Sequence, residues 1–241
     1  MEKLNKGVAA ANVAEPGAVR KGWVRRAVVW TAVAVAGVWL LAVVLLVVMK
    51  WVDPPTTMVQ MERRVQGWFG AKPYEKQQTW EPLGQISPQL QHAVISSEDG
   101  RFYMHHGFDW EAIQKDAEKD MEGGRLRGGS TITQQLVKNL FFGTGRSWVR
   151  KGAETTLVPV AEVVLGKQRI LEIYLNVVEW GPGVYGAEAA CRNWDRVSAK
   201  AVSRDEAARL AAILPAPRKR HPERMNGYSG IILERMRQVG W

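Results

Sequence analysis

One uninterrupted apolar segment constrains the fold of this chain more than any other feature. Residues 27–49, AVVWTAVAVAGVWLLAVVLLVVM, carry no charged side chain over 23 positions. As an α-helix the segment would be roughly 35 Å long, and the hydrocarbon core of a bilayer is about 30 Å thick. A buried helix of a soluble core and a cleaved signal peptide are the alternatives, but a signal peptide has a shorter apolar region and a clear small-residue cleavage site. We therefore predict one retained transmembrane helix.

The charges on either side of this segment predict its orientation. Trp23 and Trp51 stand where aromatic side chains anchor a helix at the membrane surface, and the N-terminal flank is strongly basic. Because basic flanks stay in the cytoplasm, the rest of the chain would lie outside it. The basic residues of the flank are Lys3, Lys6, Arg20, Lys21, Arg25 and Arg26. The predicted division is a cytoplasmic tail at 1–26, a transmembrane helix at 27–49, a juxtamembrane linker at 50–86 and a folded domain at 87–241.

Composition narrows the class of partner. The chain has 241 residues and a formal net charge of +9, and its 46% of hydrophobic residues is enough for a packed core. A basic surplus suggests phosphate groups on nucleic acid, on anionic lipid or on a phosphorylated substrate. The predicted export argues against nucleic acid and leaves membrane lipid and a phosphate-bearing substrate. The single cysteine, Cys191, cannot form an intrachain disulfide framework.

Helix signals dominate the exported part, so the predicted fold is mainly α. Ser87 followed by Pro88 is typical of a helix start, and Glu98 falls near the end of that helix. Strand signals are few. Further helices are predicted after Asp109 (to Gly123 and Gly124), after Ser130 or Thr131 (to about Gly143), at 148–165 with an interruption at Pro159, at 167–176, after Ser203 (to Pro215) and over the C-terminal tail.

A polar stripe runs along the helix predicted near residue 131. Thr131, Gln134, Gln135 and Lys138 recur at offsets that place them on one helical face. Such a stripe is usually a solvated face, and this interpretation stays open. Two observations favour phosphate binding instead. The stripe carries amides and hydroxyls in place of a Glu/Lys mixture, and two glycines at 128–129 precede a helix N-terminus, where free backbone N–H groups attract anions.

Arg150 and Glu154 are four residues apart on another predicted helix. The simpler interpretation is an exposed ion pair worth a few tenths of a kcal/mol. The functional interpretation is a guanidinium group that a carboxylate holds in one orientation. The residues alone favour the simpler interpretation.

The stretch SSEDGRFYMHHGFDW, residues 96–110, gathers ionisable groups and has three interpretations. A metal site would use Glu98, Asp99, His105 and His106, but the helical H-x-x-x-H spacing of many such sites is missing. A surface loop is the common role of adjacent acidic residues. A general base is the third interpretation, because a carboxylate at a helix C-terminus faces the negative end of the helix dipole, which opposes its ionisation and strengthens it as a base.

Five motifs in a fixed order carry a resemblance to a known family. They are EDGRFYMHHG (98–107), GGSTITQQLVKN (128–139), RKGAE (150–154), KQRILEIYLN (167–176) and EAARLAAILPAP (206–217). Together they resemble the bacterial peptidoglycan glycosyltransferases, specifically the monofunctional, membrane-anchored transglycosylases of cell-wall synthesis. The resemblance covers about residues 53–241, and Cys191–Asp195 departs from the aromatic-rich pattern of the family.

The resemblance implies a fold and a reaction. The fold would be lysozyme-like and α-helical, with a membrane-facing lobe and a long cleft. The substrates would be lipid II and a growing lipid-linked glycan strand at the bacterial inner membrane. The 4-hydroxyl group of the N-acetylglucosamine of lipid II would attack C1 of the terminal N-acetylmuramic acid of the strand. Undecaprenyl diphosphate would leave, and a β-1,4 bond would form with inversion.

The resemblance also implies roles for individual residues. Glu98 is the candidate base that takes the proton of the 4-hydroxyl group. Lys138 and Arg150 match positions that bind the leaving diphosphate. Glu154 is the second acidic residue of the family's site, either orienting Arg150 or assisting at the diphosphate. The other cleft residues would be Ser130, Thr131, Gln134 and Gln135, and the supporting residues would be Asp99, Phe102, His105 and Lys151.

Two other functions compete with this expectation. A glycan hydrolase could share the fold and the central glutamate, but hydrolysis releases no diphosphate for Lys138 and Arg150 to bind. A non-catalytic scaffold of a cell-wall synthesis complex would not need the ionisable residues together. No cofactor or structural metal is required, although Mg²⁺ or Mn²⁺ at the diphosphate is compatible with the sequence. Membrane lipid and other cell-wall synthesis proteins are the remaining expected partners.

Overall fold

The computed structural model describes residues 16–70, 74–121, 129–145 and 147–241. The chain divides into two compact units, with the boundary between Ala42 and Val43. The N-terminal tail to residue 15, and the glycines predicted at a helix end (123 and 124) and before a helix start (128), lie outside the described residues.

Helix α1 (Pro16–Met49) contains the apolar segment. Within it, Gly22–Met49 is long and apolar enough to cross a membrane. Most of its large apolar side chains, from Trp23 to Val48, are exposed, whereas a helix of a soluble core would bury them. This helix is consistent with a single-pass membrane anchor.

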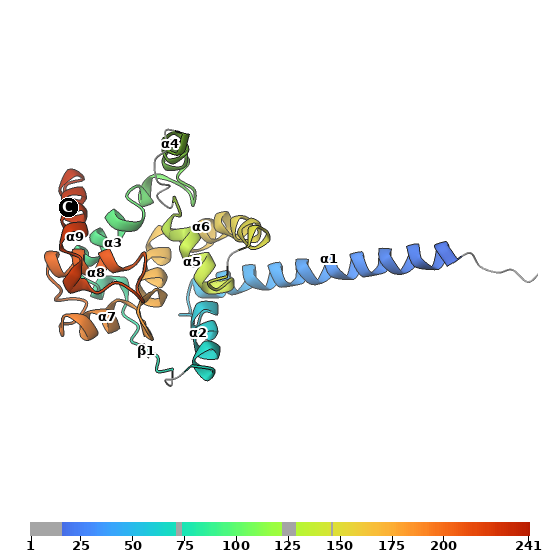
Figure 1. The fold of residues 1–241 in the computed structure, drawn as a ribbon, viewed down its shortest axis with the longest axis horizontal. Coiled ribbons are helices and arrows are strands. Elements are labelled where there is room, and N and C mark those ends of the chain that lie inside the picture. Colours follow the sequence, from blue (N-terminus) through green and yellow to red (C-terminus); the bar gives the residue numbers. More distant parts are fainter. Residues whose placement is uncertain (1–15, 71–73, 122–128, 146) are drawn as a thin grey trace, which may run out of the picture. The chain divides into compact units, whose positions relative to one another are not determined.

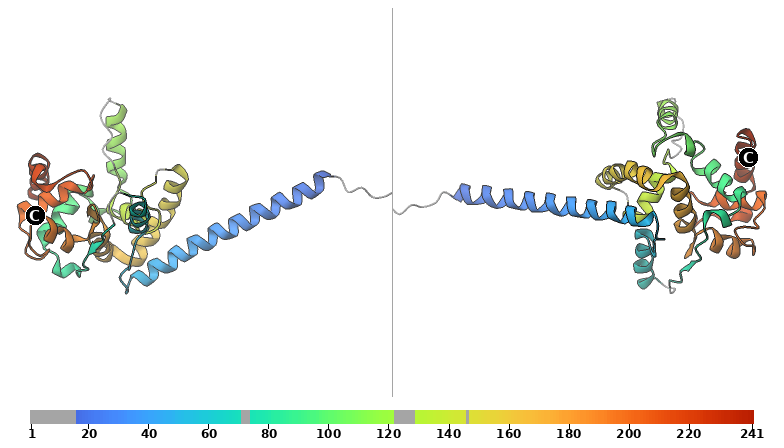
Figure 2. Two further views of the ribbon diagram at one scale, coloured as in Figure 1. Left: turned by 60° about the horizontal axis from the view of Figure 1, so that its bottom comes forward. Right: turned by 180° about the vertical axis from the view of Figure 1, so that it is seen from behind.

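The second unit is predominantly helical, which confirms the predicted fold class. Helices α3, α8 and α9 pack against one another in one group, and α5 packs against α6 and α2 in another (Figures 1 and 2). The helices are α2 (Met58–Trp68), α3 (Pro88–Glu98), α4 (Trp110–Met121), α5 (Ile132–Phe141), α6 (Trp148–Val177), α7 (Ala187–Trp194), α8 (Arg204–Ile213) and α9 (Asn226–Gln238), with 3-10 turns η1 (Leu83–Gln85), η2 (Phe102–Met104) and η3 (Pro222–Arg224).

The start and end of α3 follow from local chemistry. The Ser87 side chain accepts a hydrogen bond from the backbone N–H of Gln89 at 3.2 Å, and Pro88 occupies the first turn, where its missing N–H costs nothing. Leu90 and Val94 are fully buried in the group formed with α8 and α9. The predicted helix, with Glu98 at its end, is confirmed.

Helix α6 differs from the prediction. The structure joins the two helices predicted at 148–165 and 167–176 into one element, with non-helical dihedral angles at Gly166 alone (φ 70°, ψ 164°). The predicted interruption at Pro159 is wrong, because the fixed φ of proline fits a helix and its helical geometry continues there. The break falls at Gly166 because a positive φ is readily adopted by glycine.

The predicted linker contributes packed elements to the second unit. Helix α2 packs on α5, and β1 (Gln77–Gln78) pairs in parallel with β3 (Val184–Tyr185), which pairs antiparallel with β2 (Glu179–Gly181). Gly183 has φ +80°, and a Cβ atom there would lie 2.2 Å from the Glu75 carbonyl oxygen. This small sheet and α7 are not among the predicted elements.

Candidate active site

Glu98 lies at the end of α3 and connects to α5 and α6 through a short chain of hydrogen bonds. Its Oε2 atom accepts a hydrogen bond from Nε2 of Gln135 at 2.8 Å. The hydroxyl group of Tyr174, which is fully buried, donates to Oε1 of Gln135 at 2.9 Å. The tyrosine thereby fixes which end of the amide faces Glu98, and the amide fixes the carboxylate.

The surroundings of Glu98 suit a base. Burial raises the pKa of Glu98, and hydrogen bonds from Gln135 and Ser97 together with the charges of Lys138 and Arg220 offset part of this effect. A carboxylate with a raised pKa binds a proton more readily than an ordinary surface glutamate does. The half-buried side chain also remains accessible, since it lines a cavity of about 790 Å³ with Ser130 and Arg235.

Asp99 joins the end of α3 to the start of α5. Its Oδ2 atom accepts a hydrogen bond from the backbone N–H of Ile132 at 3.0 Å, and its Oδ1 atom lies 2.8 Å from Nε2 of His105. Nδ1 of His105 accepts from the N–H of Gly107, so Nε2 carries the proton that is donated to Asp99. Thr131 closes the ring by donating to the Gly107 carbonyl oxygen at 2.7 Å. The surface-loop interpretation of this stretch is therefore wrong.

The two adjacent histidines diverge, as their backbone positions predict. His105 is buried in the ring just described, whereas His106 is exposed. A different triad, Asp99, His105 and Asp109, brings possible metal-ligating atoms within 4.8 Å of one another. These carboxylates already accept hydrogen bonds from the backbone at the starts of α5 and α4, so a metal ion could bind only by displacing existing partners.

Lys138 lies one turn beyond Gln135 on α5. Burial lowers the pKa of Lys138, the charge of Glu154 offsets part of this shift, and the charge of Arg150 adds to it. The ammonium group has no hydrogen bond or salt bridge with any residue that the structure describes. A half-buried cation without a fixed partner, near Glu98, is placed to receive an anionic ligand.

Arg150 and Glu154 form a second charged group at the start of α6. Nη1 of Arg150 bonds the Glu154 carboxylate, and Nζ of Lys151 lies 3.5 Å from its other oxygen. Glu154 is only 2% exposed, so this is not the surface pair that the residues alone favour. The electrostatic effect of Glu154 and Arg150 on Lys138 shows that this group and Lys138 belong to one charged region.

The polar stripe of α5 is not a solvated face. Thr131 and Gln134 are buried, and their side chains form a reciprocal capping box at the helix N-terminus. Gln135 and Lys138 are half-buried and face Glu98 and the charged region. Glu98, Gln135 and Lys138 therefore lie close together, whereas the side chains of Thr131 and Gln134 cap the N-terminus of α5.

Phe102 is fully buried, and its backbone N–H donates to the Asp99 carbonyl oxygen at 2.9 Å. Nζ of Lys167 lies 4.4 Å from the centroid of its ring and 2.8 Å from Glu162, which in turn accepts a 2.6 Å hydrogen bond from Thr133. Three motifs distant in sequence therefore meet at one buried contact. Gly107 belongs here too, because its φ of +93° and the 2.5 Å from its virtual Cβ atom to Val158 exclude a larger residue.

Sequence reasoning missed three residues of this region. Tyr174 and Glu162 lie within helical stretches whose spacing shows only that they face inward. Arg220 follows α8 in a basic run, and its guanidinium group acts electrostatically on Glu98 while donating to the Ala212 carbonyl oxygen at 2.8 Å. The run RKRH was the one available signal for Arg220.

Comparison with known proteins places this site in a family. The model of the family described as Transglycosylase matches residues 64–237. A protein of Pseudomonas putida named biosynthetic peptidoglycan transglycosylase is 46% identical over 219 residues, covering 89% of this chain and 90% of its own. A protein of Chromohalobacter salexigens with the same name is 45% identical over 224 residues, covering 91% of this chain and 96% of its own. The chain therefore belongs to the transglycosylase family.

Proposed function

We propose that Glu98 is the general base of this protein, a peptidoglycan glycosyltransferase that polymerises glycan strands. The observation that carries the proposal is the chain of hydrogen bonds Tyr174–Gln135–Glu98, which holds one carboxylate of raised pKa beside Lys138. A base must be near its proton donor and must be fixed in orientation. Glu98 meets these conditions because it lines a cavity that a substrate can enter and because Gln135 and Ser97 both donate hydrogen bonds to its carboxylate.

In the proposed reaction lipid II is the acceptor and the lipid-linked glycan strand is the donor. The Glu98 carboxylate takes the proton of the 4-hydroxyl group of the acceptor N-acetylglucosamine. The oxygen attacks C1 of the terminal N-acetylmuramic acid of the donor, and the bond from C1 to the diphosphate oxygen breaks. The bonding electrons leave with undecaprenyl diphosphate. Attack opposite the leaving group gives a β-1,4 bond with inversion.

Lys138 and Arg150 would stabilise the leaving diphosphate. Negative charge develops on this group as the bond breaks, and cations fixed beforehand lower the energy of that state. The free ammonium group of Lys138 and the guanidinium group of Arg150 belong to one charged region, which supports this assignment. Nε of Arg150 is buried without a hydrogen-bond partner among the described residues, so the guanidinium group retains an unused donor.

Glu154 would orient Arg150. Both Glu154 oxygens face cations, since one accepts from Arg150 and the other lies near Lys151. A carboxylate paired on both sides is poorly placed to exchange protons with a substrate, but it holds a planar guanidinium group well. Lys151, Asp99, His105 and Phe102 would then support the site, and Ser130 would line its cavity.

The mechanism does not depend on a cofactor, because Lys138 and Arg150 supply positive charge. Mg²⁺ or Mn²⁺ could add to this charge by binding phosphate oxygens, which are ligands that these ions prefer. Polymerisation rates with and without EDTA test this part of the proposal. A loss greater than that caused by Lys138→Ala would make the metal the principal source of charge.

The site would work outside the cytoplasm. The basic residues before the apolar segment 27–49 support an N-terminus in the cytoplasm and a catalytic domain on the periplasmic face of the inner membrane. In this arrangement the lipid tails of both substrates and α1 share one bilayer. Other cell-wall synthesis proteins are the proposed protein partners, and nucleic acid is not among the partners.

Incubation of the purified protein in detergent, with lipid II and separately with preformed glycan strands, tests the function. We expect long glycan strands and released undecaprenyl diphosphate. Fragments of preformed glycan without polymer would instead establish a hydrolase. If a folded protein gave neither product, the remaining function would be that of a non-catalytic scaffold.

A further inference from the structure

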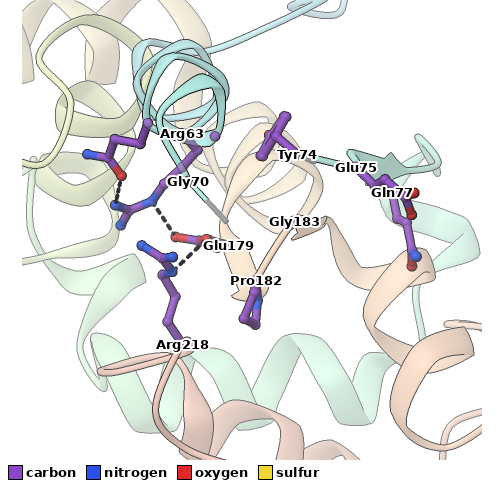
Figure 3. Close-up of a pocket in the computed structure, with 11 residues that line it drawn as sticks. Arg63, Gly70, Tyr74, Glu75, Gln77, Glu179, Pro182, Gly183 and Arg218 are labelled. Atoms are coloured by element: carbon purple, nitrogen blue, oxygen red, sulfur yellow. Dashed lines mark hydrogen bonds and ion pairs between the residues drawn. The ribbon is translucent and has the colours of Figure 1, made fainter. Parts of the chain in front are cut away.

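A second cavity, of about 610 Å³, lies where α2 faces the small sheet and the segment that follows α8 (Figure 3). The charged residues of its lining are Arg63 of α2, Glu75, Glu179 of β2 and Arg218. The proposed reaction uses none of these four residues. Gly67, Gly70 and Gly183 also line the cavity, and their lack of side chains leaves it open.

Glu179 is the central group of this cavity. It is 7% exposed and lies between two guanidinium groups, with Nε of Arg63 at 3.3 Å from Oε2 and Nε of Arg218 at 3.9 Å from Oε1. Figure 3 shows the two arginines approaching the carboxylate from two different elements, Arg63 from α2 and Arg218 from the segment after α8. Oε1 accepts no hydrogen bond from any residue that the structure describes. A buried carboxylate oxygen without a donor is costly, so a ligand that donates there is favoured.

Both arginines also have N–H groups that are free to donate hydrogen bonds to a ligand. Arg63 donates through Nε to Glu179 and through Nη1 to Gln66 at 2.9 Å, and no described residue engages its Nη2. Arg218 is about half-exposed and makes no hydrogen bond with the described residues. The guanidinium fork of Arg218 is therefore available for a carboxylate, with which it can form two parallel hydrogen bonds.

The charge arrangement selects the class of ligand. A lone anion would meet the Glu179 carboxylate at the centre of the cavity, and a lone cation would meet two guanidinium groups. A group that carries both charges a few ångströms apart satisfies both sides. An α-amino-acid head group, with an ammonium and a carboxylate on one carbon, has this property.

We propose that the cavity binds an amino-acid head group on the stem peptide of the substrate. Its ammonium group would donate to Oε1 of Glu179, and its carboxylate would accept from Arg218 and Arg63. The assignment rests on the proposed function, because that function brings a peptide-bearing glycan to this enzyme.

Two connections relate the cavity to the candidate active site. Arg218 is two residues before Arg220, whose charge acts on Glu98. On the other wall, Glu62 precedes Arg63 on α2 and accepts a 2.6 Å hydrogen bond from the N–H of Thr144, next to Gly143, whose carbonyl oxygen accepts from Arg150 at 3.5 Å. A peptide attached to a sugar near Glu98 and Arg150 would therefore pass Arg220 or Glu62, which are close in sequence to the lining residues Arg218 and Arg63.

Three forms of lipid II that differ only in the third stem residue test the inference. The residue would be meso-diaminopimelate, which ends in an amino-acid head group, its carboxamide at that end, or lysine. We expect wild-type kcat/KM to be about tenfold higher for the free carboxylate than for the other two, the scale of one charge-assisted hydrogen bond. Arg218→Ala should remove this preference. Glu179→Gln should lower the rate with all three forms, because each carries the ammonium group.

The control is Arg237→Ala, which removes an exposed arginine paired with Glu234 on α9 and should keep the wild-type preference. Equal wild-type rates for the three substrates, or a preference that survives in Arg218→Ala, would overturn the inference while the polymerase function stands. A wild-type protein that polymerises none of the three would overturn the proposed function itself.

Discussion

At the scale of single residues, two kinds of charged group divide the work of the site. Glu98 is a carboxylate of raised pKa with neutral hydrogen-bonding partners, which suits proton transfer. Arg150 is a guanidinium group tied to a buried carboxylate, which suits fixed charge. Partners set the role of each carboxylate, because Glu154 is also buried but has its two oxygens facing Arg150 and Lys151.

Removing either cation should slow the reaction. We expect Lys138→Ala and Arg150→Ala each to lower kcat by at least about tenfold, because each loses a contact that strengthens as the diphosphate leaves. Arg150→Lys should recover only part of the rate, since lysine lacks the planar fork. Steady-state rates on lipid II measure this, with the exposed Lys200→Ala as the control. Rates within about twofold of wild type for both alanine variants would instead indicate an ordinary surface pair.

The pKa of Glu98 also predicts a pH dependence of stability. Because burial raises this pKa, the folded state binds the proton more tightly than the unfolded state does. The resulting stabilisation is complete below the unfolded pKa and is lost as pH rises through the folded pKa. Glu98→Gln stays neutral, so its free energy of unfolding relative to wild type should increase between about pH 4 and about pH 8. Urea unfolding in detergent at both pH values measures it, and a pH-independent difference would contradict the assignment.

At the scale of elements, the site depends on how the end of α3 meets the start of α5. Asp99 makes this joint by accepting from the first turn of α5 and from His105. The joint fixes the position of Glu98, the preceding residue, relative to Gln135. Loss of the Asp99 hydrogen bonds would move Glu98 away from Gln135.

Asp99→Ala should therefore destabilise the second unit. We expect a loss of about 1–3 kcal/mol, because the N–H of Ile132 and the His105 ring lose a buried acceptor. Ser203→Ala is the matched control, since it removes an exposed cap of α8 and should cost about 1 kcal/mol. Unfolding of both variants in urea gives the comparison. An Asp99→Ala protein as stable as wild type would exclude the proposed joint.

The sequence predicts some elements well because their signals are local. Caps at Ser87, Asp109, Thr131 and Ser203 mark helix starts that the structure confirms, since each accepts a hydrogen bond from its own first turn. The sheet could not be predicted in this way. Its strands are two or three residues long, and β1 is paired with a strand more than a hundred positions away.

The same limit applies to the site. Motif spacing places Thr131, Gln134, Gln135 and Lys138 on one helix face, but it cannot show that Gln135 is the one that bonds Glu98. It also cannot show that Tyr174 reaches Gln135 from α6, because that contact depends on how α5 and α6 pack. Resemblance supplied the candidate residues, and packing determined which of them share a partner.

At the scale of the whole molecule, the account requires the catalytic unit to be outside the cytoplasm. A reporter enzyme that is active only in the periplasm, fused after Trp241, should be active because the basic residues before the apolar segment 27–49 favour a cytoplasmic N-terminus. A reporter active only in the cytoplasm, fused at the same position, should be inactive. The reverse pattern would remove access to the proposed lipid-linked substrates.

Polymerisation of lipid II by Glu98→Gln tests the central claim most directly. Glutamine keeps the size of the side chain and can still accept from Gln135, but it cannot take a proton from the 4-hydroxyl group. We predict a kcat lower than wild type by about 10²–10⁴, the range for loss of a general base, with the circular dichroism spectrum unchanged. Near-normal turnover by the folded variant would show that another group accepts the proton.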